Sequence, residues 1–100
     1  MTYHIRFTRL AKEDLMRLYV FRLHTDHASA VDALEAITHG IDFLHRFPFS
    51  CRRIHHDSPF LRELIISFGS TGYVALFKID DHHVVKILAI RHQHEDDYYT

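Results

Sequence analysis

The sequence predicts an α+β protein with the order β-α-α-β-β-β, in which about four strands form an antiparallel sheet and a helix hairpin covers one face. Three observations support this fold class. Apolar residues recur at steps of three and four through the first half of the chain, as on one face of a helix. After Pro59 the pattern changes to the alternation that is typical of strands. Segments rich in Gly, Ser, Thr and Asp separate the alternating stretches and predict turns.

The first half predicts one strand and one helix. Residues 3–7 alternate between apolar and polar side chains, which indicates a half-buried strand. Thr8 then offers a hydroxyl at a helix start. Residues 9–23 are expected to form an amphipathic helix, because its apolar positions recur at helical spacing: Ala11, Leu15, Leu18 and Tyr19.

A second helix follows a short connector, with Asp26 and Ser29 as alternative N-caps. Gly40 lies inside this helix and is expected to let it pack closely against the first one. Pro48 is expected to stop the helix, since the residue before a proline is pushed out of the helical region. The apolar stripe of the second helix consists of Leu34, Ile37, Ile41 and Leu44. Two such helices predict an antiparallel hairpin.

Residues 49–60 are expected to form a loop, and the rest of the chain is expected to form strands. Two short turns divide this region into an antiparallel meander, which the first strand is free to join. The predicted strands are residues 61–68, 73–79 and 84–91.

The 100 residues are expected to form a single domain, residues 1–100. Their longest apolar runs are too short to cross a membrane, and the N-terminus lacks the apolar core of a signal peptide. A single cysteine, Cys51, cannot form an internal disulfide, so the cytoplasm is the expected compartment and Cys51 is expected to be inert.

The formal charge of −1 does not favour nucleic-acid binding, which usually shows a basic excess. A local basic patch can still act in a neutral chain. The basic stretch of the sequence comprises Arg46, Arg52, Arg53, His55 and His56, whereas Glu95, Asp96 and Asp97 make the C-terminus acidic.

Several segments resemble the RelE/ParE superfamily of toxins from type II toxin–antitoxin systems. The second half carries RELIISF at 62–68, GYVALF at 72–77 and ILAIRHQHEDDYY at 87–99. Its ending, from Arg91 to Tyr98, resembles the RHQREDDY motif of the ParE-like branch, and His94 stands where arginine is frequent. The first half is similar to the family at Phe7, Thr8, Ala11, Asp14 and Leu15.

The resemblance implies the toxin component of an addiction module that stabilises plasmids and is held silent by a cognate antitoxin. For the ParE-like branch it implies DNA gyrase as the target and no catalytic residues. The RelE branch implies instead an endoribonuclease that cuts messenger RNA on the ribosome. A member that has lost its toxicity is a third alternative. No cofactor is expected, and the oligomeric state stays open. The antitoxin is expected on an exposed sheet face, a strand edge or the groove beside the helix hairpin.

A ribonuclease would need a general base, a general acid and cations on the phosphate. Arg62, Arg91 and His92 are the candidate catalytic residues for that alternative. Strand alternation predicts that Arg91 and His92 point to opposite faces, and that His92 shares a face with Lys86. The competing interpretation makes the three candidates solvated strand-end residues or antitoxin contacts.

The chain has 11 histidines, and three pairs of them raise the question of a metal site. The pairs are His55–His56, His82–His83 and His92 with His94. No three ligands show a recognised spacing, so surface histidines are the favoured interpretation and no metal is predicted. Tyr3, Phe68, Tyr73 and Phe77 are likewise expected to be core or sheet-surface residues rather than base-stacking platforms.

Overall fold

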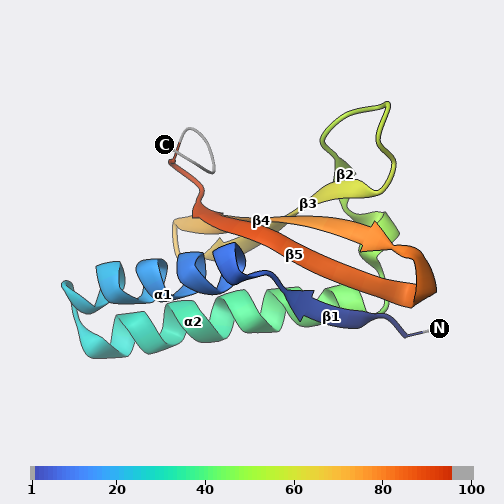
Figure 1. Cartoon of the computed structure of the whole chain (residues 1–100). Helices are drawn as coiled ribbons and strands as arrows, with labels where there is room; N and C mark the ends of the chain where they lie inside the picture. The colour runs from blue at the N-terminus through green and yellow to red at the C-terminus, as the bar shows by residue number, and fades with distance from the viewer. Residues whose placement is uncertain (1, 96–100) are drawn as a thin grey trace.

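The computed structural model describes residues 2–95 and has two layers, a sheet and a helix hairpin that covers one of its faces (Figure 1). The predicted α+β class is therefore confirmed. The helices and strands are β1 (His4–Phe7), α1 (Arg9–Leu23), α2 (His27–Asp42), β2 (Arg52–Arg53), β3 (Leu61–Phe68), β4 (Thr71–Asp80) and β5 (Val84–His92). Three short 3-10 turns connect them: η1 (Phe43–His45), η2 (Pro48–Ser50) and η3 (Asp81–His83). No helix in the described part of the chain is long and apolar enough to cross a membrane.

Within residues 2–95, the sheet has five strands in the order β1-β5-β4-β3-β2. The fifth strand is β2, which lies in the segment expected to be a loop. It contains only Arg52 and Arg53, both exposed, so it shows no alternation by which it could be recognised. The sheet is mostly antiparallel, as expected, but β1 pairs with β5 in parallel. Alternation marks a strand but does not encode its direction.

Side-chain caps start both long helices. The Thr8 hydroxyl accepts a hydrogen bond from the amide of Ala11 at 3.1 Å, as the sequence predicts for α1. Of the two candidate caps for α2, Asp26 takes the role and accepts from the amide of Ser29 at 2.7 Å. The helix ends at Asp42, well before Pro48, which instead opens the turn η2.

Gly40 brings α2 close to the sheet rather than to α1, which corrects the sequence-based expectation. A methyl group placed on Gly40 would lie 2.8 Å from Cγ1 of Ile66 on β3. The apolar stripe of α2 faces the same way, with Ile37 and Ile41 buried in the same hydrophobic core as Phe77 of β4. The glycine therefore permits a helix-to-strand approach that a side chain would prevent.

A β-bulge in β5 reverses the alternation of its side chains. Phe77 of β4 pairs with Ile87, but the preceding Leu76 pairs with Ala89, so Leu88 is the extra residue. Beyond the bulge, Ile90 and His92 point toward the helices, in register with Ala75 and Tyr73 of the core. The expectation that Lys86 and His92 share a face is therefore wrong, whereas the opposite orientation of Arg91 and His92 agrees with the register.

The turn between β4 and β5 contains two residues in the left-handed region, His82 with φ 62° and His83 with φ 60°. Replacing the exposed His82 with glycine relieves this strain, while glycine also loses more freedom on folding. We expect a net gain of about 0.5 kcal/mol in the free energy of unfolding, measured by urea denaturation. The control His82→Ala keeps the strain, so an equal gain in both variants would contradict this explanation.

Candidate functional site

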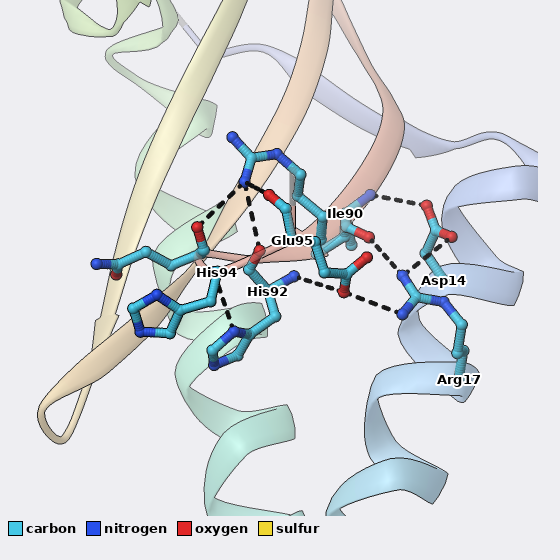
Figure 2. A network of polar contacts seen from close by, with 8 residues as sticks. Asp14, Arg17, Ile90, His92, His94 and Glu95 are labelled. Atoms are coloured by element: carbon cyan, nitrogen blue, oxygen red, sulfur yellow. Dashed lines mark hydrogen bonds and ion pairs between the residues drawn. The ribbon is translucent and has the colours of Figure 1, made fainter. Parts of the chain in front are cut away.

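A polar network surrounds the C-terminal end of β5, where the family-like motif begins (Figure 2). β1 pairs with β5 only as far as Ile87. Beyond that point, side chains of α1 form hydrogen bonds with the backbone of β5. Asp14 accepts a hydrogen bond from the amide of Ile90 at 2.9 Å, and Arg17 donates to the carbonyl of Ile90 at 3.4 Å. The Thr8 hydroxyl lies 3.1 Å from the carbonyls of Ile87 and Leu88. The start of α1 thus closes the free edge of β5.

Glu95 folds back onto the same network. Its Oε1 lies 3.1 Å from Nη1 of Arg17 and accepts a hydrogen bond from the amide of His92 at 3.1 Å. Arg17 in turn lies 3.6 Å from Asp14, so one chain of contacts joins α1 to the end of β5. The rest of the motif, Asp96, Asp97 and Tyr98, lies outside the described residues.

Arg91 holds the turn that follows β5. Its Nη1 donates to the carbonyl oxygens of His92 at 3.3 Å, Gln93 at 3.4 Å and Glu95 at 2.9 Å. Its Nη2 lies 4.0 Å from a carboxylate oxygen of Glu63 on β3. With its side chain only 15% exposed, Arg91 fixes the backbone of residues 92–95 from the face of the sheet that lacks helices.

His92 lies on the helix-covered face with both ring nitrogens engaged. Nδ1 accepts a hydrogen bond from the amide of His94 at 3.1 Å, so Nε2 carries the proton and donates to the Thr71 hydroxyl at 2.9 Å. Partial burial lowers the pKa of His92, and the neighbouring His94 lowers it further, against the opposing effect of Glu95. The ring is therefore a neutral structural link between the turn and β4.

Arg62 lies far from this network, near the start of β3. It donates to the carbonyl oxygens of Pro59 at 2.8 Å, Phe49 at 3.0 Å and Cys51 at 2.7 Å, and it stacks on the ring of Phe49. The three candidate residues therefore do not meet. Arg91 and His92 are neighbours on opposite faces, and each of the three makes contacts that hold backbone segments together.

Sequence reasoning did not single out Arg17, Thr71 or Glu63, although each binds a residue of this network. Asp14 and Arg17 are three residues apart on α1, a spacing that places two opposite charges on the same face of the helix and could have suggested an ion pair. Glu63 and Thr71 gave no such signal, because their partners come from distant positions in the chain.

One depression borders the network, and another lies along the helix hairpin. The first, of about 390 Å³, lies beside His92 and is lined by Arg17, Leu18, Phe21, Arg22, Tyr73, His92, His94 and Glu95. The other, which we call the hairpin groove, has about 450 Å³ and is lined by Phe7, Lys12, Leu15, Met16, Tyr19, Leu34 and Thr38. An apolar groove of this kind suits the apolar face of a partner helix. Within residues 2–95, no three His, Cys, Asp or Glu side chains gather closely enough to hold a metal ion.

The His92 link predicts a loss of stability in mild acid. Because folding lowers the pKa of His92 from its usual 6.5, the unfolded chain takes up the proton first as the pH falls. The contribution of His92 to stability is present above pH 6.5 and decreases as the pH falls from there through the lower pKa of the folded state. We therefore expect the stability difference between wild type and His92→Gln to shrink between pH 7.5 and 5 in urea denaturation.

The control is His39→Gln, at an exposed position of α2. A pH-independent difference for His92→Gln, or the same pH dependence for His39→Gln, would contradict the role of the ring.

Comparison with known proteins gives concordant results. A family model described as the ParE toxin of the type II toxin–antitoxin system parDE matches residues 5–97. A chain of the chromosomal ParDE toxin–antitoxin system of P. aeruginosa is similar in structure, with a TM-score of 0.75, 20% identity, and coverage of 91% of this chain and 96% of that one. A chain of the RelBE2 toxin–antitoxin complex of Mycobacterium tuberculosis has a TM-score of 0.58, 27% identity and coverage of 92% and 99%. Comparison with curated proteins gives no match.

Proposed function

Since the chain belongs to the ParE toxin family of type II toxin–antitoxin systems, we propose that it inhibits DNA gyrase in the cytoplasm and is silenced by a cognate antitoxin. In this proposal the toxin acts by binding and carries no catalytic residues. The alternative is a ribosome-dependent messenger endoribonuclease that uses Arg62, Arg91 and His92.

The contacts of His92 are the main observation that favours one of these two functions over the other. A general base must offer a lone pair to the proton that it removes. The Nδ1 lone pair of His92 is occupied by the amide of His94, and Nε2 faces Thr71. Arg91 projects from the other side of the sheet, and Arg62 is held at a distance by three carbonyl groups. This geometry favours a binding toxin over a nuclease.

The test compares the two targets with the purified chain. We expect inhibition of DNA supercoiling by gyrase at concentrations that leave ribosome-bound messenger intact. His92→Ala removes the proposed base, and His39→Ala is the matched control at an exposed histidine. A general base contributes roughly a hundred- to ten-thousand-fold to rate, so its loss in a nuclease would be unmistakable. Messenger cleavage by wild type that disappears in His92→Ala alone would overturn the gyrase proposal.

The hairpin groove is the proposed docking surface for the antitoxin. Its lining is almost entirely apolar, and Met16 at its edge is 62% exposed, a large apolar side chain left uncovered on α1. Burying such side chains against an amphipathic helix removes apolar surface from water. The similar structures from ParDE and RelBE2 systems support an antitoxin partner for this chain.

Met16→Glu is expected to weaken binding of the antitoxin encoded beside this gene at least tenfold, or about 1.4 kcal/mol, by calorimetry. The control is Ile65→Glu, the same kind of change at a residue that is 50% exposed on the sheet face opposite the helices. The reverse ranking would place the antitoxin on that sheet face instead.

A further inference from the structure

Three cationic side chains stand side by side on the sheet face that the helices leave uncovered. Arg6 of β1 pairs with Lys86 of β5, and Lys86 pairs with Lys78 of β4. Neighbouring strands lie roughly 4.8 Å apart, so these residues form a line of positive charge across three strands. We call Arg6, Lys86 and Lys78 the cationic row.

The cationic row is unfavourable for folding, because like charges directly opposite one another in a sheet repel. Asp80 offsets part of the repulsion, with carboxylate oxygens 3.1 Å from Nζ of Lys86 and 3.6 Å from Nζ of Lys78. Hydrogen bonding from Lys86, and then the charges of both lysines, lower the pKa of Asp80. Arg6 is exposed and makes no ion pair within residues 2–95. Asp80 therefore forms ion pairs with two cations of the row and leaves the third without one.

The strand residues on the open face of the sheet have a positive balance, although the chain carries a formal charge of −1. The described strand residues of this face include the cations Arg6, Arg52, Lys78, Lys86 and Arg91 but only the acids Glu63 and Asp80. Net charge therefore concealed a cationic face, because its members come from four strands far apart in the sequence. A surface of one sign attracts ligands of the other regardless of the total charge.

The end of the row borders a shallow hollow of about 440 Å³, lined by Arg6, Asp80, Asp81, His82, Val84 and Lys86. Arg6 and Lys86 reach this hollow from adjacent strands, and Lys86 is still 49% exposed despite its contact with Asp80. Both cations are thus available to an anionic group that approaches the face from solvent.

We propose that the cationic row contacts the phosphate backbone of duplex DNA while the toxin is bound to a target enzyme that itself holds DNA. This inference rests on the proposed gyrase function, which supplies DNA at the site of action. Three phosphate contacts alone give only weak non-specific affinity. Tethering to a DNA-bound enzyme raises the effective DNA concentration to about the millimolar range, where a weak site is occupied.

The binding test uses a fluorescent 20-base-pair duplex without gyrase, titrated with the full chain over a salt series. Release of counterions from three phosphates predicts a slope of about −2.7 for the logarithm of affinity against the logarithm of salt concentration. The triple variant Arg6→Gln, Lys78→Gln, Lys86→Gln is expected to bind at least tenfold more weakly at low salt, with a slope near zero. The control triple Arg9→Gln, Arg46→Gln, Arg53→Gln removes three exposed cations outside this face and should bind as wild type does.

Asp80→Asn provides a variant that gains function. Removing the carboxylate that neutralises the row should tighten DNA binding severalfold, which a merely misfolded protein would not show. Equal losses in the two triple variants, or no tightening by Asp80→Asn, would overturn the proposal. Tighter binding of single-stranded RNA, or of polyglutamate, than of the duplex would also overturn it and assign the row to that partner. If the chain binds the duplex through the cationic row but does not affect supercoiling, the DNA contact is supported and only the gyrase function is rejected.

Discussion

Replacing Arg91 with methionine is expected to lower the free energy of unfolding by about 3 kcal/mol. Methionine keeps much of the side-chain volume but removes the hydrogen bonds to the carbonyl groups of His92, Gln93 and Glu95. Because Arg91 is only 15% exposed, water does not replace those bonds freely. A loss of this size corresponds to a fall in Tm of about 12 to 24 °C for a domain of this length.

Arg52→Met is the matched control, since Arg52 binds the same carboxylate of Glu63 at 2.7 Å with a side chain that is 59% exposed. Exposed ion pairs contribute about 0 to 1 kcal/mol, so this variant should be close to wild type in urea denaturation. Similar losses in both variants would mean that Arg91 acts only as a counter-charge for Glu63 and not as the clamp of residues 92–95.

Gly72→Ala is expected to be as damaging, although it adds only one methyl group. The Cβ of alanine would lie against the backbone carbonyl oxygen of Ile66 on β3, well inside van der Waals contact, and 3.0 Å from the side-chain oxygen of Gln93. Backbone in a paired strand cannot move away cheaply, and overpacking of this kind costs about 3 kcal/mol. Thermal or urea denaturation measures the loss directly.

Gly69→Ala distinguishes this steric effect from a general intolerance of substitution in the same hairpin. Gly69 has φ 60°, and a Cβ added there would meet no atom within 4 Å, so alanine there suffers only the left-handed strain of about 1 to 2 kcal/mol. If Gly69→Ala were the more destabilising of the two variants, the close approach of Gly72 to Ile66 would not explain the loss of stability in Gly72→Ala.

The elements that could be predicted from sequence are those whose signals are local. The spacing of apolar residues placed α1 at residues 9–23, the same bounds that the structure shows, and Thr8 was identified as its cap. Two turns and three strands of the meander were also predicted, because Gly69 and the residues after Ile79 interrupt apolar, strand-like segments.

The features that escaped prediction depend on contacts between distant segments. One extra residue at Leu88 changes which face His92 occupies, and nothing in the alternation of β5 marks it. Gly40 was assigned to the wrong neighbour because a helix sequence does not say which element it approaches. The roles of Arg62 and Arg91 in holding backbone carbonyls, and the alignment of the cationic row, arise only when strands from both ends of the chain come together.

The parallel pairing of β1 with β5 also sets the order in which this toxin can mature on the ribosome. His4 pairs with Val84 and Thr8 donates to the carbonyl of Leu88, so the first strand has no partner until nearly the whole chain has been made. At a synthesis rate of about 5 to 20 residues per second, the partner residues of β5 are made about 4 to 16 seconds after β1. The sheet, the closed edge of β5 and the cationic row are all completed by this last step. The nascent chain therefore cannot complete its sheet until residues near position 88 have been made.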